Sequence, residues 1–171
     1  MKEEIRIFSS LGADGFVFGV LNEDGSVNQK TCKELIEQAD GKPCTFHRAF
    51  DVSADLNQSL EDIIDCGIHR ILTSGGKESV ESGLPKIKEL MEQAGGRISI
   101  MPGGGMKPEF VPPLRKIGLL KEVHASCKKI EKAPGRYVHE ELQFTIDGLE
   151  PDQFLSVDEQ KVRDFKKILL N

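Results

Sequence analysis

Residues able to do acid–base and anion-binding chemistry recur along the chain, each group directly after a short apolar run. These groups supply imidazoles, a guanidinium, a carboxylate, hydroxyls and clustered glycines. They are Gly19; His47, Arg48 and Asp51; Thr73, Ser74, Gly75 and Gly76; Pro102, Gly103, Gly104 and Gly105; and His124 and Ser126. An apolar run that ends for structural reasons alone needs a turn residue at that point, not an imidazole or a guanidinium. We therefore expect these positions to form one site.

The side-chain types suggest distinct roles within such a site. His47 can act as a general acid or base, because an imidazole titrates near neutral pH. We assign Asp51, His124 and Ser126 to the same catalytic group, with the last two orienting the reacting part of a ligand. The alternative is that each histidine is only a hydrogen-bonded residue of the fold, and that Arg48 and Asp51 form a surface ion pair.

The glycine clusters at 75–76 and 103–105 each precede a predicted helix, where free backbone N–H groups favour an anion. They predict a subsite for a phosphate or carboxylate group. The proposed ligand-binding residues are Arg48, Thr73, Ser74, Gly75, Pro102, Gly103, Gly104 and Gly105. Neither cluster matches a P-loop or a dinucleotide fingerprint. Tight turns that require positive φ angles are the alternative explanation of the glycines.

Cuprous copper prefers soft ligands from cysteine, methionine and histidine. Of the four cysteines, Cys44 lies three residues before His47, and Cys127 lies three residues after His124. Residues three apart on a strand point to opposite faces, so this spacing assigns no metal site. The chain has no C-x-x-C pair and no pattern of a disulfide framework, which favours reduced thiols and a cytoplasmic protein.

Positioning these residues requires regular elements, and the chain repeats one unit: a short apolar strand, a turn and an amphipathic helix. Strands are predicted over 14–20, 43–50, 70–74, 97–101 and 122–126, and helices over 28–39, 54–66, 84–94 and 107–117. Such alternation implies a parallel sheet, whose functional groups gather at the carboxyl ends of the strands. The predicted fold class is α/β, an incomplete TIM-type (β/α) barrel with five parallel strands and outer helices.

The remaining segments complete this picture. A helix over 3–11 leads into the first strand, residues 131–156 are irregular with a short strand over 143–146, and a closing helix covers 157–170. The 171 residues suffice for one domain but fall short of the ~250 of an intact TIM barrel. Alternation along the strands predicts an inner face that includes Thr45, His47, Ser99, Met101, His124 and Ser126.

The composition argues against two classes of partner. The net charge is −5, and no cluster of lysine or arginine offers a surface for a nucleic-acid backbone. No apolar run approaches the ~20 residues of a membrane span, and the first residues do not form a secretory signal. We therefore expect neither nucleic acid nor a membrane as a partner.

Five segments resemble CutC motifs in the same order along the chain. They are GADGFVFG at 12–19, TFHRAFD at 45–51, RILTSG at 70–75, MPGGG at 101–105 and HAS at 124–126. The resemblance to the CutC family runs from about residue 3 to residue 127. It implies a TIM-barrel fold, a cytoplasmic location, a role in copper homeostasis and copper as the bound ion.

Members of that family carry three strands before the segment that corresponds to 12–19, including an acidic–Cys strand end and an Arg-Pro-Arg strand end. This chain has neither, so the resemblance implies one CutC-like barrel domain over 1–171 that lacks the first three βα units. Unpaired sheet edges and uncovered apolar surface then predict self-association. Three functions stay open: a copper-binding homeostasis protein, an enzyme acting on a small anionic metabolite, and an inactive product that is stable only by self-association.

Overall fold

The computed structural model describes residues 1–135, 148–150 and 152–170. The chain divides into two compact units, Met1–Ala125 and Ser126–Asn171. The first unit holds a four-stranded parallel sheet in which each strand pairs with its neighbours in sequence. Its strands are β1 (Phe16–Phe18), β2 (Cys44–Phe46), β3 (Arg70–Thr73) and β4 (Ser99–Pro102). The predicted α/β class is confirmed.

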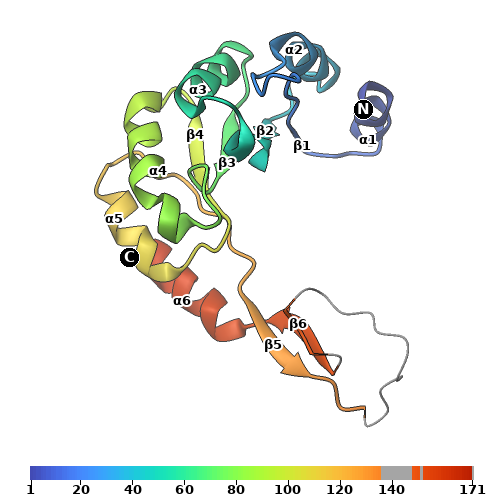
Figure 1. Ribbon diagram of the computed structural model, residues 1–171. Helices are drawn as coiled ribbons and strands as arrows, with labels where there is room; N and C mark the ends of the chain where they lie inside the picture. The colour runs from blue at the N-terminus through green and yellow to red at the C-terminus, as the bar shows by residue number, and fades with distance from the viewer. Residues whose placement is uncertain (136–147, 151, 171) are drawn as a thin grey trace. The chain divides into compact units, whose positions relative to one another are not determined.

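Helices connect these strands, and α2, α3 and α4 lie along one side of the sheet (Figure 1). The helices of this unit are α1 (Lys2–Ser10), α2 (Gln29–Gln38), α3 (Leu56–Asp65), α4 (Val80–Ala94) and α5 (Val111–Arg115), with the 3₁₀ helices η1 (Arg48–Val52) and η2 (Pro108–Phe110). Helices α2 and α3 begin after Asn28 and Asp55, whose side chains accept hydrogen bonds from N–H groups of the first turn. Helix α4 ends at Gly95, which adopts a left-handed φ of 56°.

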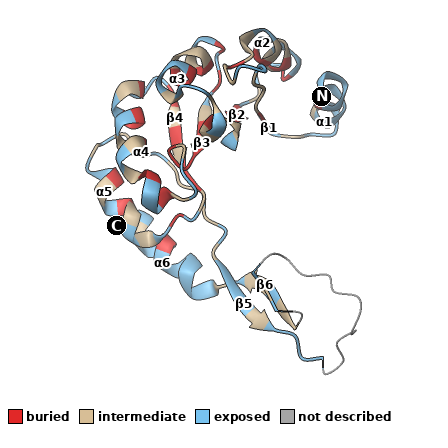
Figure 2. Cartoon of the chain, in the orientation of Figure 1, coloured by how far each residue is buried: buried red, intermediate tan, exposed pale blue. Residues whose placement is uncertain are grey.

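The core of this unit is a row of register partners across the four strands. Phe18, Phe46, Ile71 and Ile100 are neighbours in the sheet, and none of them is more than 3% exposed. Figure 2 shows buried residues concentrated on the strands and on the helix sides that face them. Burial of each such side chain stabilises the fold by roughly 1.5–3 kcal/mol.

The opposite face of the sheet carries a row of register partners that is polar apart from Val17, and we call it the polar row. Val17, Thr45, Arg70 and Ser99 are register partners, and Val17 is 66% exposed. The Arg70 guanidinium donates to Thr45 Oγ1 at 3.1 Å and to Glu122 Oε1 at 2.5 Å. Ser99 Oγ donates to the same Glu122 oxygen at 2.7 Å. The prediction that Thr45 and Ser99 share one face is therefore confirmed.

The predicted fifth strand at 122–126 is wrong. Within the described residues, this segment pairs with the sheet only through a bridge between His124 and Gly103, in which His124 N donates to Pro102 O at 2.9 Å. A ladder needs repeated pairs, and Ser126 already begins the second unit. The described sheet has four strands instead of five.

Three other elements depart most from their predicted ranges. The strand predicted over 43–50 ends at Phe46, because the chain turns into η1. The helix predicted over 84–94 starts earlier, at Val80, whose N–H donates to Gly104 O at 2.8 Å and whose side chain is fully buried. The helix predicted over 107–117 is divided into η2 and α5, each of which carries proline at its start.

The second unit contains an antiparallel hairpin and one helix. Strand β5 (Lys128–Lys132) pairs with β6 (Gln153–Val157), and α6 (Glu159–Leu170) follows. The hairpin corrects the irregular structure predicted for the described part of 131–156, whereas the closing helix is confirmed. The strand predicted over 143–146 lies outside the described residues. The single barrel domain lacking three βα units stays a prediction.

No helix in the described ranges combines the length and the apolar character required to cross a membrane.

Candidate functional site

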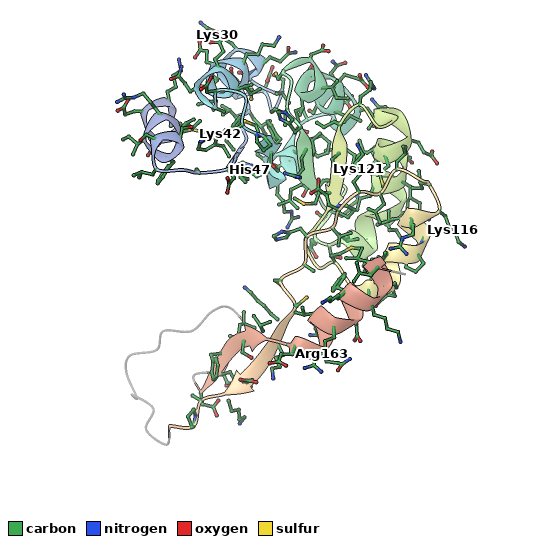
Figure 3. All side chains as sticks on the ribbon, turned by 180° about the vertical axis from the view of Figure 1, so that it is seen from behind. Lys30, Lys42, His47, Lys116, Lys121 and Arg163 are labelled. Atoms are coloured by element: carbon green, nitrogen blue, oxygen red, sulfur yellow. The ribbon has the colours of Figure 1, made fainter. Side chains whose placement is uncertain are left out.

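His47 begins the site, at the carboxyl end of β2. Figure 3 shows it on the side of the sheet away from α2 and α3. Its ring packs edge-on against Phe46, with centroids 6.2 Å apart, and its Nδ1 accepts a hydrogen bond from Ala49 N at 3.2 Å. Gly19 makes room for this ring, because a Cβ there would lie 2.7 Å from His47 Nδ1. Since Nδ1 is an acceptor, a neutral His47 carries its proton on Nε2.

Asp51 connects η1 to the turn after β3. Its side chain is only 5% exposed. Its carboxylate receives hydrogen bonds from Thr73 Oγ1, Ser74 N, Gly76 N and Arg48 Nε, and Ser74 Oγ lies 3.0 Å away. Burial raises the pKa of the Asp51 carboxyl, but the hydrogen bonds from Thr73, Arg48, Gly76 and Ser74 outweigh burial, so the pKa lies below its ordinary value. Asp51 is therefore a buried anion that fixes its neighbours.

Arg48 is held in one orientation by these neighbours. Its Nε donates to Asp51 Oδ2 at 2.7 Å, and its Nη2 donates to Ser74 Oγ at 2.6 Å and to Lys77 O at 3.2 Å. Its Nη1 lies beside the glycine turn, because a Cβ on Gly104 would be 3.0 Å from this atom. The side chain is 43% exposed, so the guanidinium is fixed on one side and accessible on the other.

The turn after β3 is shaped by close backbone contacts. Gly75 has a φ of 76°, and its N–H donates to Thr73 Oγ1 at 2.8 Å. Gly83, inside α4, presses against this turn, since a Cβ there would lie 1.8 Å from Ser74 O. Helix α4 can therefore approach the turn only with glycine at position 83.

The glycine turn after β4 joins the same edge of the sheet. Gly103 N donates to Thr73 O at 2.9 Å, which keeps this turn beside the end of β3. A Cβ on Gly103 would be 2.5 Å from Leu72 Cδ1 and 3.0 Å from His124 Cβ. His124 is exposed and lies against this turn. The loops after β2, β3 and β4 thus form a continuous chain of contacts.

Most of the predicted site residues therefore meet at one edge of the sheet. We call this group the strand-end cluster: His47, Arg48, Asp51, Thr73, Ser74, Gly75, Gly76, Pro102, Gly103, Gly104, Gly105 and His124. Ser126 is the exception, because it is exposed and begins the second unit. Arg48 and Asp51 form an ion pair, but its carboxylate is buried and so the pair does not lie at the surface. Binding of an anion by Arg48 stays a prediction.

Sequence reasoning missed two structural contributions. Arg70 and Glu122 form the centre of the polar row on the open face of the sheet, with Arg70 32% and Glu122 30% exposed. An arginine inside an apolar strand was visible in the sequence and could have indicated this pair. Gly83 offered no such indication, because its role depends on a backbone contact with a distant turn.

A metal ion needs several ligating side chains close together. Among the described residues, no group of three or more His, Cys, Asp or Glu side chains is placed to hold one. Cys32, Cys44 and Cys66 are buried, and burial raises the pKa of the Cys66 thiol to about 11. These thiols fill the core as small apolar side chains.

Comparison with known proteins shows a consistent relationship. The chain matches the family model described as CutC family over residues 1–129. It is 41% identical over 144 residues to a CutC family protein of Bacteroides fragilis (strain YCH46), which covers 84% of this chain and 57% of that protein. It is 36% identical over 169 residues to the copper homeostasis protein cutC homolog of Mus musculus, which covers 98% of this chain and 62% of that protein.

Solved structures agree with these matches. The crystal structure of a copper homeostasis protein CutC from Streptococcus agalactiae is similar with a TM-score of 0.65 at 31% identity, over 72% of this chain and 60% of that one. A structure described as native KDPGal has a TM-score of 0.57 at 13% identity, over 99% of this chain and 65% of that one, and shows similarity of fold alone. The chain spans about three-fifths of the length of the relatives it matches.

Proposed function

The chain belongs to the CutC family, and on that premise we propose that it is a copper homeostasis protein that binds cuprous copper. The observation that carries the proposal is the family match over residues 1–129, which includes the whole strand-end cluster. The mouse relative, a copper homeostasis protein cutC homolog, supports the same role.

Copper is the cargo in this proposal and not a resident cofactor. The described residues add no ligand set of their own, so the proposal rests on family membership. The hydrogen bond that His47 accepts restricts its use as a copper ligand. Its Nε2 could bind a metal only after its proton moved to Nδ1, which would cost the hydrogen bond from Ala49 N.

Equilibrium dialysis with cuprous ion under reducing conditions tests the proposal. We expect saturable binding, and a stoichiometry near zero would remove the copper role. Two matched variants sharpen the test. Cys66→Ala should bind copper as wild type does, because this thiol is buried. If a thiol contributes to binding, it is that of the half-buried Cys127, and copper affinity should then fall in Cys127→Ala.

The same proposal includes a cytoplasmic location and self-association. Reduced thiols support the location, because Cys32, Cys44 and Cys66 are free in the structure. Exposed apolar side chains on α1 and directly after it, among them Phe8 and Leu11, support self-association.

A second candidate function is an enzyme that acts on a small anionic metabolite. The observation that favours it is the fixed orientation of Arg48 beside the glycine turn. In this candidate His47 donates from Nε2 to a ligand oxygen, and His124 contacts the same ligand from the far side of the cluster. Asp51 does not touch the ligand but positions Arg48.

A thermal-shift screen of phosphorylated and carboxylated metabolites, followed by turnover assays on the hits, tests this candidate. We expect at least one hit whose turnover is lost in His47→Ala and kept in His69→Ala, the matched change at a histidine that accepts from Cys44 N. If no anion stabilises the protein and His47→Ala behaves as wild type, the enzyme candidate loses its basis.

A further inference from the structure

We propose that Arg48 Nη1 and the backbone N–H groups of Gly104 and Gly105 form a binding subsite for a phosphate group. The inference rests on the second candidate function, for which it names the class of ligand: a phosphate ester of a small metabolite. The subsite itself is defined by the guanidinium and the glycine turn.

The guanidinium supplies the first donors. Two of its three nitrogens are already used, Nε by Asp51 and Nη2 by Ser74 Oγ and Lys77 O. Within the described residues, Nη1 donates to no protein atom, and it faces Gly104. A fixed guanidinium loses little conformational freedom when it binds an anion, so its remaining donors are preorganised.

The glycine turn supplies the next donors. Gly104 and Gly105 both have positive φ angles, 96° and 70°. In the part of the chain that the structure describes, neither of their N–H groups donates to a protein acceptor. Gly104 is half-buried and Gly105 is exposed, so the turn that carries these groups is open to solvent. A side chain at 104 would collide with the guanidinium, because its Cβ would lie 3.1 Å from Arg48 Cζ.

The number of donors favours phosphate. Two N–H bonds on Nη1 and two backbone N–H groups suit a phosphate, which carries three terminal acceptor oxygens and up to about two negative charges. The nearby negative charge of Asp51 does not oppose binding strongly. Its carboxylate is 5% exposed and is satisfied by the turn after β3 and by Arg48 Nε, on the other branch of the guanidinium.

Isothermal titration with inorganic phosphate, with sulfate and acetate as parallel arms at matched ionic strength, tests the subsite. Wild type should bind phosphate saturably and acetate more weakly. Arg48→Gln should weaken phosphate binding about tenfold or more, as expected when a charged hydrogen-bond donor is lost. Arg97→Gln is the matched control, because Arg97 pairs with Glu61 outside the strand-end cluster and is 48% exposed. It should bind phosphate as wild type does.

A second pair of variants distinguishes a loss of phosphate affinity caused by filling the subsite from one caused by backbone strain. Gly104→Ala places a methyl group against the guanidinium and should lower phosphate affinity by a similar factor. Gly118→Ala carries the same kind of φ penalty, at 79°, but its Cβ meets nothing within 4 Å, so its affinity should be unchanged. This pair also tests the subsite if Arg48→Gln fails to fold.

The inference is overturned if wild type shows no saturable phosphate binding, or if the two control variants lose as much affinity as Arg48→Gln and Gly104→Ala. The measurement needs neither copper nor turnover. Failure of the copper role or of the enzyme candidate therefore leaves a positive phosphate result intact, and failure here leaves the copper proposal intact.

Discussion

Asp51 shows how a single residue can organise a site without contacting a ligand. Its buried carboxylate binds the turn after β3 through Thr73, Ser74 and Gly76, and binds η1 through Arg48. A buried anion in contact with so many donors is stable only while all of them stay in place. The orientation of Arg48 therefore depends on Asp51.

Replacing Asp51 with asparagine should lower the free energy of unfolding by about 2–4 kcal/mol at neutral pH, because an ion pair with a buried carboxylate and several charged hydrogen bonds are lost. The folded pKa of Asp51 lies below the ordinary value of 3.8, so its contribution is present above that pH and is lost as the pH falls through the folded pKa. The difference between wild type and variant in urea denaturation should thus shrink in acid.

The matched control is Asp55→Asn, at the N-terminal cap of α3. Asparagine caps a helix about as well as aspartate, so this change should cost little. Equal losses in Asp51→Asn and Asp55→Asn would contradict the role given to Asp51.

Thiol reactivity should distinguish the cysteines. Cys32, Cys44 and Cys66 are buried, and burial raises the pKa of each thiol, to about 11 for Cys66. Since the thiolate is the reactive form, these three should resist alkylation near neutral pH, and Cys127 should react first. Mass spectrometry of the native protein over time would measure this order, and rapid labelling of Cys66 before denaturation would contradict it.

Sequence alone could locate the strand-end cluster but not its internal contacts. Imidazole, guanidinium and glycine groups after apolar runs identified the edge of the sheet correctly. The assignment of Asp51 to catalysis is untested, and the contacts favour a positioning role because they already occupy the carboxylate. Such contacts depend on which loops meet in space, and side-chain type does not specify that.

At the scale of elements, α4 is placed by a residue without a side chain. Gly83 is the fourth residue of this helix, inside its helical span, where alanine would normally be favoured by roughly 0.5–1 kcal/mol. Its position against Ser74 O reverses this preference, because the backbone of the turn occupies the space of a Cβ. The contact couples α4 to the loop that holds Asp51 and Arg48.

Gly83→Ala should therefore destabilise the protein by about 1–3 kcal/mol, as expected for overpacking. Ser82→Ala, at the preceding and exposed position of α4, is the control and should cost little, because it loses only an exposed hydrogen bond from Ser82 Oγ to Ser79 O. Thermal unfolding followed by circular dichroism measures both. A gain of stability in Gly83→Ala would show that α4 does not depend on this close approach.

Periodicity predicted the elements better than their ends. Helices α2 and α3 begin and end within two residues of the predicted ranges. The start of α4 was missed, because the helix begins at Val80, whose N–H bonds to Gly104 O in a turn that is distant in sequence. The segment at 122–126 has strand-like residues, but pairing depends on a neighbour that sequence does not reveal.

For the molecule as a whole, the feature that bears on association is the exposed apolar surface of the first unit. Ile7 and Phe8 on α1 are 44% and 55% exposed, and Leu11 directly after this helix is 75% exposed. Val17 on the edge strand β1 is 66% exposed. Unpaired edge strands and apolar faces of this kind favour association.

We therefore expect light scattering to give a dimer or a larger species, which Phe8→Lys or Leu11→Lys should shift toward the monomer. Val52→Lys is the control, because Val52 is 74% exposed and lies in η1, not on α1 or β1. A monomer of wild type at all concentrations would contradict self-association.

The central claim is that the strand ends form one ligand site built around Arg48 and the glycine turn. Its most direct test is the change in backbone-amide NMR spectra of isotope-labelled protein during titration with inorganic phosphate. We predict that the largest shifts fall on residues 74–76 and 103–105, and that residues around Arg97 stay unchanged. Shifts that leave both of these turns unaffected, or that centre on another part of the chain, would contradict it.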